Sequence, residues 1–534
     1  MAGRAQPVSA WPGTSAAITL AVLILGTLTA VALRAETGAG LGRADWAAIR
    51  FTLIQAAISG LISVLIAIPV ARALARRRFR GRRILIALLG VPFILPVIIA
   101  VLGLLEVFGR AGWISDALGL LGFEPIRIYG LHGVVLAHVF LNLPLATRLI
   151  LQAWQEVPAE RFRLAAQLGC DGRAMFWLIE WPMLQRILPG AFAVVFAICL
   201  TSFAVALTLG GGPRATTIEL AIYQAFRFDF ALGRAALLSG VQLILTILAA
   251  ALALWLATGT GFGKGLDRAV RRWDGANPVS RTADAAWIIA AALFLLLPLA
   301  AIVVSGLPNV LSLPSTVWSA ALTSLLVAAL STCLLLLLAL PMAFAIARGG
   351  RGIVELAGLL GLAASPLVIG TGLFIMIRPI ADPFALALPV TALVNAITAL
   401  PFALRVLVPT ARDVVERYGK LGVSLNMAGL PFLRFVLLPR MRPQIGFAAG
   451  LAMALSMGDL GVITLFADPD IATLPLQIYR LMGAYRLDDA AAASLLLLVL
   501  SIVVVCVLDR GGRRHAESLA LRDPEGRISP EKPF

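Results

Sequence analysis

The stretch "NLPLATRL" at residues 142–149 returns as "ALPFALRV" at residues 399–406, and this repeat decides how the chain is organised. The two copies lie 257 residues apart, and the same spacing continues downstream for about forty residues. It joins the pairs Pro144 and Pro401, Arg148 and Arg405, Leu168 and Leu425, Gly169 and Asn426, and Pro182 and Pro439. A constant register over that length is typical of a duplicated unit.

The repeat extends in both directions from this stretch. Upstream the spacing is 272 residues, with the pairs Trp46 and Trp318, and Pro69 and Pro341. Downstream it is 256 residues, with the pairs Pro213 and Pro469, and Tyr223 and Tyr479. The second copy therefore lacks about fifteen residues, and we assign the excess of the first copy to the external segment 108–130.

The composition excludes a water-soluble globule. Of the 534 residues, 60% are hydrophobic and only 13% are charged, and the mean hydropathy is +0.95. A hydrocarbon core about 30 Å thick needs roughly 20 apolar residues for each helical crossing. The sequence therefore predicts an all-α polytopic membrane protein with about twelve transmembrane helices, at residues 16–33, 51–71, 84–107, 131–151, 187–209, 236–257, 285–305, 318–346, 354–377, 388–408, 444–466 and 490–508.

Six spans in each copy give the two copies the same orientation, so the repeat is a parallel one. We expect a first six-helix repeat at 1–257, a Gly-rich and basic connector at 258–284, a second six-helix repeat at 285–508 and a tail at 509–534.

The basic residues fix the expected orientation. The net charge of +16 does not indicate nucleic-acid binding here, because the arginines gather in particular loops. The loop after the second predicted span carries seven arginines and no acid: Arg72, Arg76, Arg77, Arg78, Arg80, Arg82 and Arg83. Such loops face the cytoplasm. With this loop inside, the connector and both termini are cytoplasmic, in a bacterial inner membrane.

A second repeated stretch lies between spans. "RLAAQLGCDGRAMFWLIEWP" at 163–182 is too polar for a span, and it has a weaker copy from Leu421 to Pro439. On a helix, Ala165, Ala166 and Gly169 share one face, which lacks bulk and would fit into the groove of a partner. Asn426 replaces Gly in the second copy and still tolerates a left-handed turn. A plain loop helix joining two spans is the simpler interpretation, but the duplication at a fixed register favours a lever.

This stretch resembles the EAA motif of the permease subunits of ATP-binding-cassette importers. Ala165, Ala166, Gly169 and Pro182 occupy the motif positions, whereas Leu164 replaces its leading Glu. In the second copy the corresponding positions are Gly422, Leu425, Asn426 and Pro439. The resemblance implies a type I importer permease fold whose coupling helices dock on a separate cytoplasmic ATPase, to whose acidic groups nearby arginines such as Arg161, Arg163 and Arg173 would pair.

Over almost its full length the chain is similar to the permeases of thiamine and thiamine-pyrophosphate importers. The stretches that carry this similarity are "FGRAGWISDALGL" (108–120), "LAHVFLNLPLATRLILQAWQEVPAERFRLAAQLG" (136–169), "GGGPRATTIELAIYQA" (210–225), "SMGDLGV" and "TLPLQIY". The similarity implies a homodimeric ATPase and a periplasmic thiamine-binding protein as partners, and passage of thiamine and its phosphates between the two repeats. Fused ferric-iron importer permeases share the architecture and are the alternative.

Few other residues suggest chemistry. Asp459 lies inside a predicted span, where a charge is costly, so it either supports a helix break between Gly458 and Gly461 or contacts a cationic substrate. Glu219, Tyr223 and Tyr479 fall on the external side, where they either dock the binding protein or lie in an ordinary solvated loop. The four cysteines are scattered, and we expect no disulfide, no metal site and no cofactor.

Two other classes of protein are remote alternatives. A secondary transporter needs ionisable groups within the bilayer to couple its substrate to an ion, and the predicted spans have almost none. A membrane enzyme is disfavoured because the sequence has neither a catalytic motif nor a Walker sequence. We therefore expect no enzymatic activity in this chain, with ATP hydrolysis performed by another subunit.

Overall fold

The computed structural model describes residues 9–36, 40–90, 95–212, 215–256, 277–349, 352–427, 429–466 and 471–520, and the side chains of these residues apart from 362, 363 and 512–520. Most of the predicted connector, the last residues of the predicted tail, and the paired Pro213 and Pro469 lie outside these ranges. The described residues form helices and turns, without strands.

The first half, residues 9–256, contains twelve α-helices and one π-helix among its described residues. They are α1 (Trp11–Arg34), α2 (Arg43–Arg76), α3 (Arg82–Leu88), α4 (Val97–Phe108), α5 (Trp113–Leu120), α6 (Leu131–Glu156), α7 (Ala159–Gln167), α8 (Gly172–Met175), the π-helix η2 (Phe176–Glu180), α9 (Trp181–Leu200), α10 (Ala204–Leu209), α11 (Ile218–Arg227) and α12 (Leu232–Leu256).

The second half, residues 277–520, follows the same order. Its elements are α13 (Pro278–Gly306), the 3₁₀-helix η4 (Leu307–Ser312), α14 (Ser315–Ala347), α15 (Ile353–Ala363), α16 (Pro366–Ile377), α17 (Ala387–Ser424), α18 (Leu430–Phe432), the π-helix η5 (Leu433–Leu437), α19 (Leu438–Met457), α20 (Gly461–Phe466), α21 (Leu474–Gly483) and α22 (Leu487–Ala520). The two π-helices begin at Phe176 and Leu433, at the spacing of 257 residues that the sequence repeat predicts.

The expected all-α polytopic fold is confirmed, with a lower number of continuous spans. Within the described residues, ten helices are long and apolar enough to cross a membrane, and α15 and α16 form one further, bent pair. The predicted span 444–466 is wrong as a single helix, because the chain breaks at residues 458–460 between α19 and α20. The predicted span 187–209 breaks in the same way, at residues 201–203 between α9 and α10.

Two predicted boundaries also change. Helix α13 begins at Pro278, so the last residues assigned to the connector belong to the first helix of the second half. Helix α22 runs to Ala520, so the predicted tail begins inside a helix.

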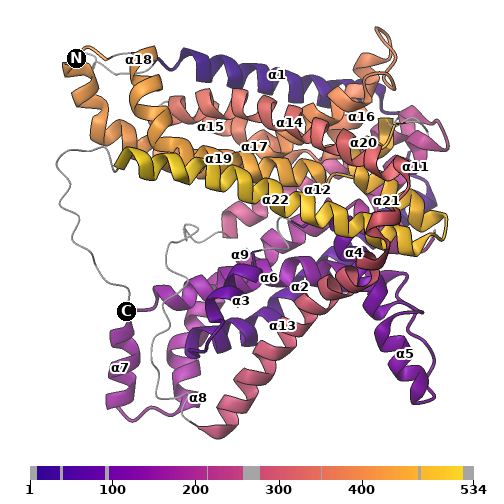
Figure 1. Ribbon diagram of the computed structural model, residues 1–534, viewed down its shortest axis with the longest axis vertical. Coiled ribbons are helices and arrows are strands. Elements are labelled where there is room, and N and C mark those ends of the chain that lie inside the picture. The colour runs from indigo at the N-terminus through magenta and orange to yellow at the C-terminus, as the bar shows by residue number, and fades with distance from the viewer. Residues whose placement is uncertain are drawn as a thin grey trace.

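The first helix of each half packs on the other half. Helix α1 lies against α14, α15 and α16, whereas α13 lies against α2 and α4 (Figure 1). Both large apolar cores accordingly combine residues of the two halves. The halves are interlocked rather than merely adjacent.

Glycines allow these crossings. A Cβ atom on Gly103 of α4 would lie 2.5 Å from the carbonyl oxygen of Pro298 on α13. On the other side of the molecule, a Cβ atom on Gly372 of α16 would lie 2.5 Å from the carbonyl oxygen of Thr27 on α1. Small residues let transmembrane helices approach this closely, and the resulting van der Waals contact stabilises their association.

We predict that Gly372→Ala destabilises the folded protein by about 1–3 kcal/mol, because the added methyl group forces α1 away from α16. The measurement is the thermal unfolding of the purified chain in detergent. Gly240→Ala on α12 is the matched control, since a Cβ atom there has no neighbour within 4 Å. Equal unfolding temperatures for the two variants would contradict the prediction.

Candidate functional site

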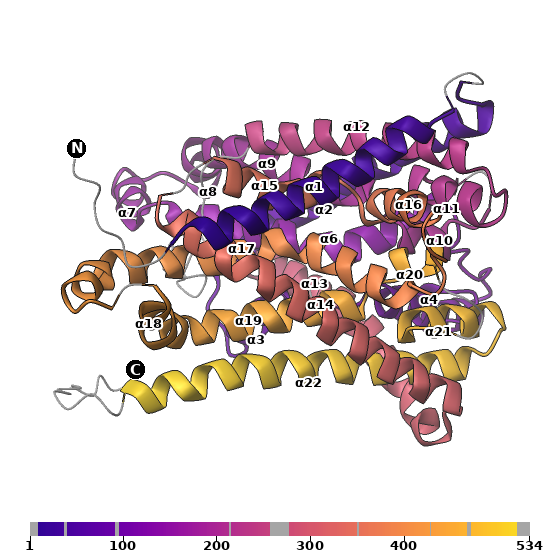
Figure 2. The ribbon, with the colours of Figure 1, turned by 90° about the horizontal axis from the view of Figure 1, so that it is seen from above.

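The repeated stretch forms a helical loop that projects at one end of the bundle in both views, where α7, α8 and α18 lie (Figures 1 and 2). Helix α7 ends in a turn in which Gly169 has φ of +69° and the Cys170 backbone N donates to the Ala165 carbonyl oxygen at 3.0 Å. The Asp171 side chain then accepts from the Ala174 backbone N at 2.7 Å and starts α8. Hydrogen bonds therefore fix both the turn that ends α7 and the start of α8.

The second loop closes with the same turn. Asn426 has φ of +55°, and the Met427 backbone N donates to the Gly422 carbonyl oxygen at 2.7 Å. The expectation that Asn426 would adopt the left-handed conformation is confirmed. The second loop differs in its approach, because α17 runs without interruption through the region that α6 and α7 share in the first half.

One small residue of each loop, Ala165 or Gly422, faces inward, which corrects part of the sequence interpretation. Ala165 is buried against Val157, Phe162 and Met175. Its counterpart Gly422 is also buried, and a Cβ atom there would lie 2.6 Å from the Phe432 ring. Ala165 and Gly422 therefore hold each loop against its own return segment, so neither is open to a partner.

The exposed positions of the loops are apolar and equivalent in the repeat. Leu164 and Leu168 are 57% and 72% exposed, and their counterparts Leu421 and Leu425 are 54% and 60% exposed. Among the residues that the sequence singled out, Ala166, Gly169 and Asn426 are also exposed. Pro182 and Pro439 lie farther along the chain, in the first turns of α9 and α19. Sequence reasoning noted Leu164 only as a departure from the motif, although a leucine on a polar loop is itself a signal of contact.

The first loop is anchored by a buried acid at its π-helix. Glu180 is fully buried and forms an ion pair with Arg72 of α2 at 2.7 Å. Its other oxygen accepts from the Trp154 indole N of α6 at 3.2 Å. The three positions that the repeat spacing pairs with Arg72, Trp154 and Glu180 are Phe344, Ala411 and Leu437, all buried in one apolar core. The same joint is thus ionic in the first half and apolar in the second.

A second candidate region lies where the broken helices of the two halves meet. Asp459 occupies the break between α19 and α20, as one of the two expectations had it, and its Oδ1 accepts from the Gly461 backbone N at 3.1 Å. Its Oδ2 is buried without a hydrogen-bond partner among the described residues. A Cβ atom on Gly461 would lie 3.6 Å from Asp459 Oδ1 and 3.8 Å from the ring of Phe203, which belongs to the first-half break.

The three residues expected on the external face are placed differently. Glu219 is fully buried in α11, so the expectation that it lies in a solvated loop is wrong. Tyr223 is half-buried, and its ring packs edge-on against that of Phe203, with 5.4 Å between the centroids. Tyr479, on α21, is also half-buried. Because α11 is amphipathic and short, packing of its apolar face turns Glu219 and Tyr223 toward the bundle rather than toward water. Tyr223 therefore belongs to the region of Asp459.

Within the described residues, no three His, Cys, Asp or Glu side chains lie close enough together to hold a metal ion. The four cysteines are free.

The sequence was compared with family models and with known proteins. No family model matches the chain. The thiamine transport system permease protein of Brucella abortus is 41% identical over 516 residues, covering 93% of this chain and 94% of its own. Those of Salmonella typhimurium and Escherichia coli are 38% and 39% identical, covering 97% and 92% of this chain and 100% and 95% of their own.

We predict that Glu180→Ala destabilises the protein by about 3–5 kcal/mol, because it leaves the Arg72 guanidinium without its buried partner. The double variant Arg72→Phe, Glu180→Leu installs the apolar residues of the second half and should recover most of that loss. Chemical or thermal unfolding in detergent measures both effects. A double variant no more stable than Glu180→Ala would show that the two joints are not equivalent.

Proposed function

The chain belongs to the family of thiamine transport system permease proteins, and from this premise we propose how it couples to a motor and where its substrate passes. It is the multi-pass membrane permease of a thiamine importer of the ATP-binding-cassette type, located in the inner membrane. The relatives that match nearly the whole chain carry thiamine in their names, and the ferric-iron alternative is not favoured. The chain itself is a transport component, without an enzymatic role.

We infer that a homodimeric cytoplasmic ATPase drives the cycle. The observation that carries this proposal is the occurrence of one loop structure twice, with the same left-handed turn at Gly169 and at Asn426. Each loop offers two exposed leucines at equivalent positions, and two equivalent surfaces suit two identical clefts. Closure of the ATPase dimer would then draw the two loops together and move the interlocked halves.

The orientation that we propose puts these loops in the cytoplasm. Helix α1 begins and α22 ends at the same end of the bundle as α7, α8 and α18, and α5, α11 and α21 lie at the opposite end (Figures 1 and 2). The arginine-rich segment that begins at Arg72 near the end of α2 lies at the loop end as well, because Arg72 forms an ion pair with Glu180 of η2. The positive-inside rule places such an end in the cytoplasm. The repeats at 1–257 and 285–508 then run parallel, and the connector and tail are cytoplasmic.

The opposite end would receive a periplasmic thiamine-binding protein. Glu219 is buried and does not face a protein on the external side. Tyr223 and Tyr479 are half-buried, so a docked protein would contact only part of each ring. We propose instead that Tyr223 lines the outer part of the pathway, where its ring packs against those of Phe203 and Phe228, and that its repeat counterpart Tyr479 does the same on the side of the second half.

The substrate pathway would pass Asp459. Thiamine is a permanently charged organic cation with two aromatic rings, and its phosphates keep the same ring system. Asp459 has a buried Oδ2 without a hydrogen-bond partner among the described residues, and its Oδ1 and the Phe203 ring both lie close to Gly461. A carboxylate and an aromatic ring together are the groups that attract an organic cation. Affinity would reside mainly in the binding protein, and the permease would offer a weaker transient contact.

We expect Asp459→Asn to lower thiamine uptake by about tenfold, since a hydrogen bond to a charged group is lost from the pathway. Uptake of labelled thiamine by vesicles containing the complete complex measures this effect. Ser202→Ala, at the equivalent position of the first-half break, is the control and should transport normally. Normal uptake by the Asp459→Asn variant would leave Asp459 with a structural role only.

We expect the double variant Leu164→Glu, Leu421→Glu to weaken association with the ATPase by more than about tenfold, because each change buries an unpaired charge in an apolar contact. Co-purification of the ATPase with the permease measures the loss. Leu120→Glu is the control, because Leu120 is also exposed but lies on α5 at the opposite end. Unchanged association of the double variant would remove the loops from the ATPase interface.

A further inference from the structure

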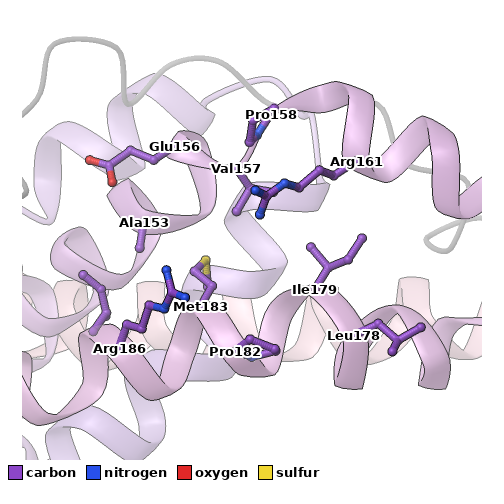
Figure 3. A pocket seen from close by; sticks show the side chains of 11 residues that line it. Ala153, Glu156, Val157, Pro158, Arg161, Leu178, Ile179, Pro182, Met183 and Arg186 are labelled. Carbon is purple, nitrogen blue, oxygen red and sulfur yellow. The ribbon is translucent and has the colours of Figure 1, made fainter.

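We propose that the first half carries a binding site for the phosphate group of an anionic phospholipid from the cytoplasmic leaflet. The site is a cavity of about 630 Å³ between the end of α6, the start of α7, η2 and the start of α9 (Figure 3). This position follows from the orientation proposed above, and the site is additional to the coupling and transport roles.

Two guanidinium groups converge in this cavity. Arg161 extends into it from α7 and Arg186 from α9, so they approach from opposite walls (Figure 3). Neither forms an ion pair with an acid among the described residues. Glu156 also lines the cavity, but its carboxylate points away from both guanidinium groups (Figure 3). Two unpaired arginines facing one another are suited to a phosphate, which each can bind through two hydrogen bonds.

The remaining lining is suited to lipid rather than to water. Apolar side chains supply most of it, among them Ile179, Met183 and Ile187. The lining residue Leu178 is 68% exposed, and Trp177, which precedes it in the chain, is 55% exposed. Tryptophan is typical of the membrane interface, and the apolar part of α9 begins beyond Arg186. The cavity therefore lies at the depth where a headgroup meets its acyl chains, and basic pockets at this depth bind anionic headgroups.

The second half lacks this arrangement. At the positions that the repeat pairs with Arg161 and Arg186 stand Tyr418 and Pro443. The guanidinium of Arg440 lies over the Tyr418 ring, 4.0 Å from its centroid. Neither repeat-equivalent position carries a cation, and the nearby Arg440 already has an aromatic partner, so we assign the proposed site to the first half.

An acidic side chain of the ATPase is the competing occupant, since the cavity adjoins the first coupling loop. The predominantly apolar lining argues against it, because a protein segment entering the cavity would bring backbone groups that these walls leave without partners. A phospholipid brings acyl chains to the apolar mouth and a phosphate to the arginines.

The test is a titration of the purified full-length chain in detergent with phosphatidylglycerol and with phosphatidylcholine of the same acyl chains, followed by native mass spectrometry. We expect the wild type to prefer phosphatidylglycerol. The variant Arg161→Gln, Arg186→Gln should bind it about thirtyfold more weakly, since each basic residue near an anionic headgroup contributes about a fivefold factor. The variant Arg161→Lys, Arg186→Lys should retain most of the binding, which guards against a folding defect in the Gln variant.

The control removes the same charge from the same loop. Arg163 and Arg173 are exposed and lie outside the cavity, so Arg163→Gln, Arg173→Gln should bind phosphatidylglycerol as the wild type does. An equal loss in this control, or equal binding of the two lipids by the wild type, would overturn the proposal. So would a cavity variant that keeps the lipid but no longer co-purifies with the ATPase, because the cavity would then serve that partner. The proposed site contacts both the phosphate and the acyl chains of the lipid. Displacement of the lipid by soluble glycerol phosphate, which has no acyl chains, would therefore also contradict the proposal.

Discussion

Within a bilayer every backbone N–H and C=O must find its hydrogen-bond partner inside the protein, and this constraint governs the whole structure. It explains why the described residues form helices joined by turns, and it restricts where a helix can break. The breaks at residues 201–203 and 458–460 occur where the two halves meet, so protein rather than lipid surrounds them. A break at such a place exposes polar groups to a passage, and Asp459 uses one of its oxygens to cap its break and leaves the other available.

The two halves share a backbone plan but differ in chemistry. Arg72, Trp154 and Glu180 form a polar joint under the first loop, and the second half replaces all three with apolar residues. A buried ion pair contributes little net stability compared with a well-packed apolar set, but it fixes geometry. The first loop, whose approach is interrupted between α6 and α7, has the ionic joint, and the second, carried by the continuous α17, has the apolar one. Each loop is thereby fixed to the bundle by side-chain contacts of its own half.

The sequence predicted the features that follow from a repeated pattern. It did not predict which side chains are buried, because burial depends on the direction in which each side chain points. The spacing of 257 residues predicted two loops with the same structure, and the left-handed turns at Gly169 and Asn426 lie at this spacing. Hydropathy merged α19 and α20 into one span, because the break is only three residues long and one Asp barely lowers the average of a window of about twenty residues. Ala165 was expected to face a partner and Glu219 to face water, yet both are buried. A helical wheel gives the relative positions of residues, but only the neighbouring elements determine which face is covered. The cavity of Arg161 and Arg186 was likewise beyond reach, since it joins residues of α7 and α9 that no motif links.

The central claim is that a separate ATPase moves two equivalent loops of this chain toward one another. The most direct measurement is the distance between spin labels at Gln167 and Ser424, which are exposed and equivalent in the repeat, after Cys170, Cys199, Cys333 and Cys506 have been replaced by Ser. The account predicts that this distance shortens when the assembled complex binds ATP, and that nucleotide has no effect on the permease alone. A distance that is the same in the nucleotide-free and ATP-bound complex would contradict it.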